Sequence, residues 1–519
     1  MKVTISKFYI TISASIVLAV INITTCHSHN VKQKKANLLF IMTDEQQANT
    51  MEIYGNRNIQ TPNLNRLSEQ SFVFKNTYVT QPVCSPSRSS IMSGLYPHTT
   101  GVTRNNIPLS KDTPCFPELL NDHDYKTAYI GKWHLGDEVF AQHGFETWIS
   151  MEDGYSGYYT EGKDRDTRSD YHLWLIEKGY NPDDEKNNKF SRYFSPSLPS
   201  IEHCKPKFLE EKACEYLEEV KNDPFVLYVN FLEPHMPFTG PLNDLHQDDD
   251  VYLPGNFDDL LDDYDPLRYR LIRQSSLDRY ANNEDSFKRL IGKYWGLVTQ
   301  VDISVGAILD KLHELGLDKN TIVVFTSDHG DMMGAHQMVG KRVMFEESVR
   351  VPLMMRIPFI TTQQKIINQR VSQIDIVPTL LELMGKPIPE SMEGKSIAPH
   401  LIEGCNLPED FIFIEWSPDF EVESRIYKRS SIPVSEEKYR RAMMSNVRTV
   451  ISPDGWKLCL RDSDCNSLFN LNNDPLETKN LFNDTTVREK ITLLTKKIED
   501  WQKQTGDTLK LNFLSQLIK

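Results

Sequence analysis

The residues with the clearest chemical potential lie in one short stretch, Cys84-Ser85-Pro86-Ser87-Arg88. Ser85 is a good helix N-cap and Pro86 suits the first helical turn, so we expect Cys84 just outside the N-terminus of a helix. Backbone N–H groups and the helix dipole favour anions there, and Arg88 adds positive charge one turn later. The stretch therefore predicts an anion site with a nucleophile at its mouth. The alternative is a buried structural cysteine, the commoner place for this residue type.

Acidic side chains follow two runs of apolar residues. Asp44 and Glu45 end one run, and Asp328 and His329 follow another. Such runs are typical of buried parallel strands, whose carboxyl ends meet at one edge of a sheet. Carboxylate oxygens suit calcium or magnesium, and calcium tolerates the looser geometry. The residues therefore predict a metal site, whereas either pair alone would more often be a helix cap or a solvated turn.

Histidines and lysines follow further apolar runs. One run leads into Gly131-Lys132-Trp133-His134-Leu135-Gly136, and another into Pro234-His235-Met236-Pro237. The prolines stiffen the backbone around His235, and a histidine pKa near neutrality would suit proton donation to a leaving alkoxide. Lys341 follows Asp328 at a separation that a returning loop can span. Each of these residues by itself is more often structural or solvated.

Several of these segments resemble one enzyme family. Residues 84–94 are similar to the sulfatase signature, Cys-X-Pro-X-Arg followed by a small hydroxyl residue and glycine. The hydroxyl residue is Ser93, where threonine is commoner. Residues 131–136 resemble a second sulfatase motif, and the matches run in the family's order from residue 36 to residue 360. Residues 468–481 are similar to the small C-terminal domain of many sulfatases, so the resemblance extends over nearly all of the chain.

The resemblance implies a formylglycine-dependent, calcium-binding hydrolase of sulfuric esters. A dedicated maturating enzyme would oxidise Cys84 to formylglycine (3-oxoalanine), whose hydrated aldehyde is the nucleophile. Arg88 and the calcium ion would stabilise the attacking oxygen. His134 would remove a proton from the hemiacetal after sulfuryl transfer, which expels the sulfate. His235 would bind the bridging oxygen and protonate the leaving alcohol.

The resemblance also implies which residues bind substrate and metal. Lys132, Lys341 and His235 would contact the sulfate ester. The calcium ligands would be Asp44, Glu45, Asp328, His329 and the modified Cys84. The family's commoner pair at positions 44 and 45 is Asp-Asp. The resemblance therefore implies direct metal ligation by Asp44 and leaves open whether Glu45 ligates the metal directly.

The elements that position these residues alternate between strands and helices. We expect strands at 37–43, 125–132, 225–232, 321–326 and 351–357, and a long amphipathic helix from 287 to 315, closed by Gly316. This alternation predicts an α/β fold with a large, mainly parallel sheet flanked by helices, which binds ligands at the carboxyl ends of its strands. By the resemblance the fold is alkaline-phosphatase-like.

The domain organisation follows from changes in this pattern. We expect a catalytic domain at 36–395, with irregular excursions at 150–205 and 240–285. Short strands and a helix beyond residue 400 predict a smaller α+β subdomain at 400–519.

The N-terminus resembles a secretory signal at 1–28, with Lys2 and Lys7 ahead of an apolar run. The run is too short and too rich in hydroxyl groups to be the first choice for a transmembrane anchor. Residues 23–26 loosely resemble a lipoprotein cleavage box ending at Cys26. We therefore expect an exported protein, periplasmic first, with an outer-membrane lipoprotein or a secreted protein as alternatives. Membrane contact is expected only if Cys26 is lipidated.

The net charge argues against two classes of binding function, and the cysteines allow disulfides. The net charge of −14 argues against a general nucleic-acid binder and gives no support for docking on anionic membranes. An acidic protein that binds an anion must gather positive charge at its site. Export permits disulfides, and we expect Cys459 with Cys465 first and Cys204 with Cys214 next.

The substrate expectation rests on export, on the polar and aromatic excursions, and on the similarity of residues 341–352 to iduronate-2-sulfatase-like and choline-sulfatase-like members. Together they favour a sulfated polysaccharide or oligosaccharide, such as algal ulvan or a glycosaminoglycan, and a role in polysaccharide degradation. Two alternatives stand beside this interpretation. One is a phosphodiesterase or phosphonate monoester hydrolase on the same scaffold, and the other is a non-catalytic binder of sulfated glycans.

Overall fold

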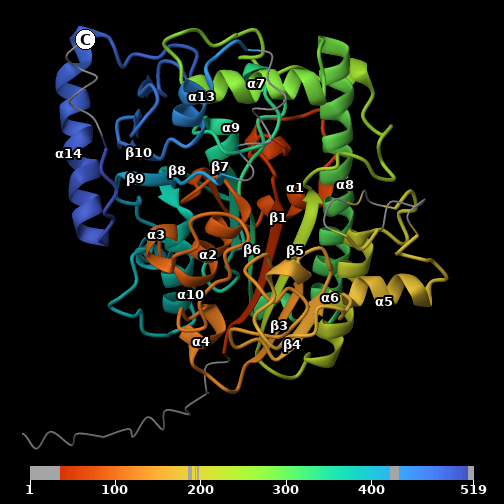
Figure 1. The fold of residues 1–519 in the computed structure, drawn as a ribbon. Helices are drawn as coiled ribbons and strands as arrows, with labels where there is room; N and C mark the ends of the chain where they lie inside the picture. The colour runs from red at the N-terminus through yellow and green to blue at the C-terminus, as the bar shows by residue number, and fades with distance from the viewer. Residues whose placement is uncertain are drawn as a thin grey trace, which may run out of the picture. The chain divides into compact units, whose positions relative to one another are not determined.

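An eight-stranded sheet organises the large part of the protein (Figure 1). The computed structural model describes residues 35–511 except 185–189, 193–194, 196–197, 421–422 and 424–431, so the expected signal segment and Cys26 lie outside the described residues. The strand order is β4-β3-β5-β1-β6-β7-β2-β8. The strands are β1 (Asn37–Asp44), β2 (Phe72–Tyr78), β3 (Lys126–Gly131), β4 (Thr147–Ser150), β5 (Phe225–Pro234), β6 (Thr321–Ser327), β7 (Arg350–Arg356) and β8 (Lys365–Ser372).

The sheet is mainly parallel, as the sequence predicts, with one strand reversed. β4, β3, β5, β1 and β6 are parallel neighbours, and β2 is parallel to β8. β7 runs antiparallel to both β6 and β2. The loop at 328–345 and the one-turn helix α9 (Glu346–Val349) lead into β7, so the chain returns from the carboxyl end of the sheet without a crossover.

Helices cover both faces of this sheet. One face carries α2 (Cys84–Ser93), α4 (Phe116–Leu120), α10 (Ile376–Leu383) and α11 (Ala398–Glu403), and α3 (Pro97–Thr100) contacts α2. The other face carries α1 (Pro62–Ser68), α5 (Asp170–Glu177), α6 (Lys205–Glu219) and α8 (Glu284–Glu314). In β1, Leu38, Phe40 and Met42 pack into the first core, whereas Leu39 and Ile41 pack into the second. Because side chains alternate along a strand, the continuous apolar run of β1 contributes to the cores on both faces of the sheet.

The long helix predicted at 287–315 is α8. It begins at Glu284, capped by Asn283, and its end is followed by Gly316 with a left-handed φ of 67°. The excursion at 240–285 is not wholly irregular, because α7 (Leu267–Arg279) lies within it, and α5 lies within the excursion at 150–205. α7 is mostly polar in sequence and α5 has only eight residues, so neither gives a clear apolar period.

A second, four-stranded antiparallel sheet follows beyond residue 400, as predicted. Its order is β12-β11-β10-β9, built from β9 (Ile412–Trp416), β10 (Val447–Ile451), β11 (Trp456–Arg461) and β12 (Ser467–Asn470), with α13 (Glu436–Met443) between β9 and β10. α14 (Arg488–Thr505) packs on one face of this sheet through Ile491, Leu494 and Ile498 (Figure 1). The other face shares an apolar core with Val351 and Phe345 of the first part.

The expected disulfides are wrong. All the cysteines in the described part of the chain are free. Cys459 faces the shared core from β11, whereas Cys465 is exposed in the following turn. Cys204 and Cys214 lie at the start and within α6, about 15 Å apart along the helix axis, which is far beyond the reach of a disulfide. Among the described residues no helix combines the length and apolar character that crossing a bilayer requires.

Candidate active site

The carboxyl ends of four neighbouring parallel strands, β3, β5, β1 and β6, meet at one point. The predicted site residues follow these strands directly: Lys132 and His134 after β3, His235 after β5, Asp44 and Glu45 at the end of β1, and Asp328 and His329 after β6. The register keeps β1 and β6 level, with Thr43 opposite Ser327. This is the place where open parallel sheets bind ligands.

Cys84 reaches the same point from α2. It is the first residue of the helix, and the N-cap is Val83, so the expected position outside the helix is wrong by one residue. Ser85 does not cap the helix, because its Oγ donates a hydrogen bond to the carbonyl of His134 at 2.7 Å. The hydroxyl thus ties the turn that carries Cys84 to the loop after β3.

The Arg88 guanidinium joins three of the strand ends. It donates to Asp44 Oδ2 at 2.9 Å, to Asp328 Oδ2 at 2.8 Å and to the Lys132 carbonyl at 2.8 Å. Lys132 Nζ pairs with Asp44 Oδ2 at 2.8 Å. Arg88, Asp44, Asp328 and Lys132 are all at most 1% exposed. Low solvent access makes these charge-assisted contacts strong and rigid.

Lys341 arrives from the loop before α9. Its Nζ lies 3.3 Å from Cys84 Sγ, 3.1 Å from Glu45 Oε2 and 3.8 Å from Asp44 Oδ1. His235 Nε2 lies 3.4 Å from Glu45 Oε2 and 4.0 Å from Asp44 Oδ1. All ten residues predicted for the site are therefore brought together.

Buried charge shifts the titration of these groups. Burial alone would raise the pKa of Cys84, but the charges of Lys341 and Lys132 outweigh it and hold this pKa well below its ordinary value. Burial and Cys84 raise the pKa of Asp44, whereas Lys132, His235 and Lys341 lower it, and the net direction is downward. Burial and the charge of Asp44 raise the pKa of Asp328 to about 6. The site thus stabilises an anion at position 84.

One group of side chains has the composition of a cation site. The ligand atoms of Asp44, Cys84, Asp328 and His329 all lie within 4.8 Å of one another. His329 Nδ1 donates to the Gly330 carbonyl at 3.0 Å, so the Nε2 lone pair points to Cys84 Sγ at 3.3 Å and to Asp328 Oδ1 at 3.5 Å. Acceptor atoms that face one another in this way fit a bound cation, and the carboxylates suit calcium. Glu45 belongs to a second group, with Asp44 and His235.

His134 and His235 have pKa values below the ordinary value of a histidine. Burial lowers the pKa of His134 to about 4, which suits a neutral base. Burial, then Lys341 and Lys132, lower the pKa of His235 to about 4 as well, below the near-neutral value expected from the sequence. The sequence does not reveal how many cations surround His235 in the fold.

Three residues near the site were not predicted. Asn106 Oδ1 lies 3.0 Å from His134 Nε2, and the Tyr155 hydroxyl lies 3.4 Å from His134 Nδ1. Tyr294 of α8 donates its hydroxyl hydrogen to the Glu45 carbonyl at 2.7 Å, and Glu45 has a left-handed φ of 70°. Asn106 and Tyr155 lie in loops without a periodic pattern, so no sequence signal marks them. In the sequence, Tyr294 fits the apolar pattern of the long helix and does not stand out.

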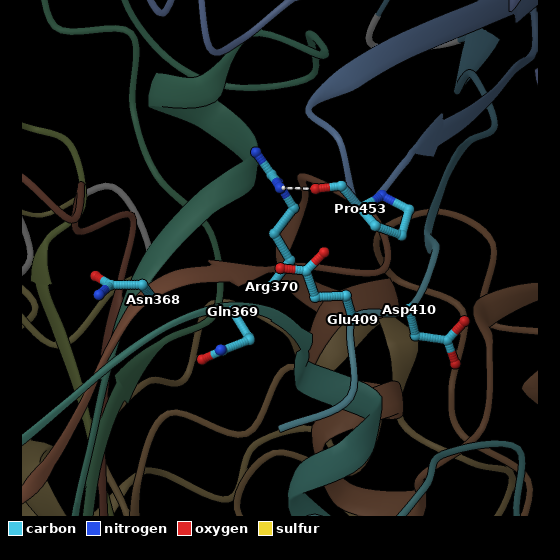
Figure 2. Close-up of a pocket in the computed structure, with 6 residues that line it drawn as sticks. All are labelled: Asn368, Gln369, Arg370, Glu409, Asp410 and Pro453. Atoms are coloured by element: carbon cyan, nitrogen blue, oxygen red, sulfur yellow. Dashed lines mark hydrogen bonds between the residues drawn. The ribbon is translucent and has the colours of Figure 1, made fainter. Parts of the chain in front are cut away.

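Cys84 is fully buried, and the most exposed predicted site residue is Lys341 at 9%. A separate polar pocket lies elsewhere, between β8 and the loops beside β9 and β10, lined by Asn368, Gln369, Arg370, Glu409, Asp410 and Pro453 (Figure 2). In Figure 2 Arg370 points to the Pro453 carbonyl, to which it donates at 2.9 Å. None of the predicted site residues lines that pocket.

Comparisons with known proteins identify the family. Residues 36–386 match the family described as sulfatase, and residues 334–504 match the C-terminal family of N-sulphoglucosamine sulphohydrolase. The chain belongs to the sulfatase family. The resemblance stated from the motifs is therefore confirmed, and the protein is a sulfatase-family hydrolase.

Individual relatives agree with this assignment. The sulfatase is 30% identical to the ulvan-active sulfatase of Formosa agariphila over 376 residues, which cover 70% of this chain and 64% of that protein. It is 25% identical to the N-acetylglucosamine-6-O-sulfatase of Bacteroides thetaiotaomicron, over 94% of this chain and 90% of that protein. The solved phosphonate monoester hydrolase of Silicibacter pomeroyi superposes with a TM-score of 0.75 at 19% identity, covering 91% of this chain and 96% of that one. This last likeness confirms the alkaline-phosphatase-like fold alone.

Proposed function

We propose that this sulfatase removes sulfate from a sulfated carbohydrate, with Cys84 converted to formylglycine and with bound calcium. The observation that carries the proposal is the convergence on Cys84 Sγ, which lies within 3.6 Å of Asp44, His329 and Lys341. Lys132 and Lys341 supply positive charge near the buried position 84, and Asp44 and Asp328 supply carboxylates for a metal ion. Hydrolysis of an anionic ester requires such stabilisation of negative charge.

Calcium would be held by Asp44, Asp328, His329 and the oxidised residue 84, with Glu45 as an alternative ligand, and would supply Lewis-acid stabilisation of negative charge. The hydrated aldehyde at position 84 would supply the attacking oxygen. Lys132 and Lys341 would bind the sulfuryl oxygens, exchanging their present pairs with Asp44 and Glu45 for the ester. Arg88 holds Asp44 and Asp328 in place and adds positive charge.

The histidines would handle protons. His235 Nδ1 donates to the Met236 carbonyl at 2.7 Å, so Nε2 is the atom that would hold and deliver a proton to the leaving alcohol. An anionic ester beside this ring would raise its pKa, because a nearby opposite charge favours the imidazolium. His134, neutral because it is buried, would accept the proton that resets the nucleophile.

The carbohydrate substrate is proposed from two kinds of support. The relatives named above act on ulvan and on N-acetylglucosamine 6-sulfate by their names. The excursion at 150–205 also contributes Tyr155 to the site. We propose ulvan-like or glycosaminoglycan oligosaccharides as the substrate class, in polysaccharide degradation.

The cellular setting follows the sequence. We propose that residues 1–28 direct export, to the periplasm or, if Cys26 is lipidated, to the outer membrane. A formylglycine-generating enzyme is the implied partner. The boundaries at 36–395 and 400–519 stay predictions.

A substrate panel tests the proposal. Protein co-produced with a maturating enzyme should release sulfate from at least one defined sulfated oligosaccharide, and Cys84→Ala should abolish that release. The matched control is Cys214→Ala, a half-buried cysteine on α6 outside the site, which should retain turnover. Higher kcat/KM on phosphate diesters or phosphonate monoesters than on any sulfate ester would favour the alternative activity. Calcium-dependent glycan binding without turnover would favour the non-catalytic binder.

A further inference from the structure

His134 is held at both ring nitrogens and at its carbonyl. Nε2 lies 3.0 Å from Asn106 Oδ1, and Nδ1 lies 3.4 Å from the Tyr155 hydroxyl. The carbonyl accepts a hydrogen bond from Ser85 Oγ, which in turn accepts one from the Asn106 backbone N–H at 3.4 Å. Three chain segments thus fix one imidazole.

The Asn106 contact determines where His134 carries its hydrogen. An amide oxygen can only accept, so Nε2 is the protonated nitrogen. A histidine that is to act as a base starts the reaction neutral, and a neutral imidazole has one N–H. The lone pair is therefore on Nδ1, the nitrogen beside the Tyr155 hydroxyl.

Tyr155 reinforces the same orientation. Its ring lies 4.4 Å from the imidazole, centre to centre, with 35° between the planes. The ring covers one side of His134, and its hydroxyl can donate to the Nδ1 lone pair. A half-turn of the imidazole about the Cβ–Cγ bond would put ring carbons where Nδ1 and Nε2 now lie, so both contacts would be lost.

The backbone is shaped for this contact as well. Asn106 has a left-handed φ of 64° and His134 has one of 59°. Left-handed residues other than glycine are uncommon, and asparagine is among the types that tolerate the conformation best. The identity of residue 106 therefore meets a backbone requirement and a hydrogen-bonding requirement together.

We propose that Asn106 is a positioning residue that holds His134 in the Nε2–H tautomer and thereby makes Nδ1 the atom that takes a proton during turnover. The inference rests on the proposed function, which gives His134 the role of base. The Tyr155 hydroxyl hydrogen turns away from the Nδ1 lone pair, a proton leaves a hydroxyl at the reacting centre and forms the Nδ1–H bond, and this proton passes to water when His134 becomes neutral again. The Nε2–H bond to Asn106 persists throughout.

Asn106→Gly is the sharpest variant, because glycine keeps the left-handed backbone without strain while removing the amide. We expect kcat to fall about 10- to 100-fold, with KM changed less than about twofold, since Asn106 acts through His134. Asn106→Asp retains an acceptor oxygen and should recover most of kcat. Asn121→Gly is the matched control: it is also left-handed, at 45°, but exposed at the end of α4, and it should leave kcat unchanged.

A spectroscopic measurement separates this inference from the proposed function. In ¹⁵N-histidine-labelled protein, the His134 resonances, assigned by their loss in His134→Gln, should show a protonated Nε2 and an unprotonated Nδ1. Asn106→Gly should give a tautomer mixture. This readout needs no turnover, so it stands even if no sulfate ester is hydrolysed. An Nδ1–H tautomer in the unsubstituted protein, or an unchanged kcat in Asn106→Gly, would overturn the proposal.

Discussion

At the scale of residues, the site depends on charges that compensate one another without water. Arg88 is 1% exposed and joins Asp44 to Asp328, both of which are fully buried. Removing one partner of such a set leaves uncompensated charge in a medium of low dielectric, which costs more than the pair contributes.

Arg88→Met should therefore lower the free energy of unfolding by about 3–5 kcal/mol, measured by denaturant titration of calcium-free protein. Arg66→Met is the matched control, because Arg66 pairs with Asp310 at the surface, where both side chains are about half exposed. The control should lose less than about 1 kcal/mol. Equal losses in the two variants would show that the site charges do not depend on Arg88.

Glu152, just after β4, makes the stability of the protein depend on pH. It is fully buried, and neither carboxylate oxygen has a hydrogen-bond partner among the described residues. Burial raises its pKa to about 8 against the partial opposition of Lys132. The folded state therefore holds this proton more tightly than the unfolded state, and stability falls as pH rises from about 4.5 through about 8.

Glu152→Gln removes this ionisation. Relative to the unsubstituted protein, the variant should gain stability between about pH 5 and about pH 9, by a few kcal/mol at most. Urea unfolding at both pH values measures the difference, and Glu146→Gln, at an exposed position, is the control. A constant difference at the two pH values would contradict the assignment of the raised pKa to Glu152.

The sequence predicted which residues lie together wherever a motif directly follows an apolar strand. Lys132, His235 and Asp328 each follow an apolar run, so their convergence follows from the parallel sheet. Asn106 and Tyr155 could not be found that way, because aperiodic loops bring them to His134. The low pKa of His235 also escaped prediction, since it depends on how many cations the fold gathers around it.

At the scale of elements, the strand ends must lie close enough to share ligands. Gly131 closes β3 with a φ of 115°, and a Cβ there would lie 2.0 Å from the Asn230 carbonyl of β5. Glycine at this position lets the two strands approach and directs Lys132 toward Asp44.

Gly131→Ala should push β3 from β5, lower stability by more than about 2 kcal/mol and reduce kcat, because Lys132 moves. Gly55→Ala is the matched control, since its φ of 109° is similar but open space surrounds a new Cβ. Its cost should be the backbone strain alone, about 1 kcal/mol. Thermal unfolding and kinetics check both variants, and equal losses would argue against the steric explanation.

Element types were predicted more reliably than strand direction. The apolar run at 351–357 indicates a strand, but apolar patterning is the same for parallel and antiparallel buried strands, so the reversal of β7 is not encoded in it. α7 escaped prediction because Leu267, Leu271 and Ile272 are its few buried aliphatic positions in a charged segment.

At the scale of the whole molecule, the small sheet supports the site through buried ions. Lys457 of β11 is fully buried and pairs with Glu346 of α9 at 3.0 Å and with Glu477 at 2.9 Å. Glu346 follows the loop that carries Lys341. The two sheets should therefore unfold together, and a change on β11 should be felt near the site.

Lys457→Met should lower the free energy of unfolding by about 3–5 kcal/mol while a single transition is kept. Lys490→Met, which breaks a surface pair with Asp454, should cost less than about 1 kcal/mol. Fluorescence and circular dichroism should give coincident curves for both variants. Two separated transitions would show that the small sheet folds independently of the catalytic sheet.

The most direct test of the central claim is the mass of the peptide that contains residue 84, taken from protein of measured sulfatase activity. Activity should rise in proportion to the fraction of peptide that carries an aldehyde in place of the Cys84 thiol. Full activity with an unmodified thiol at position 84 would contradict it.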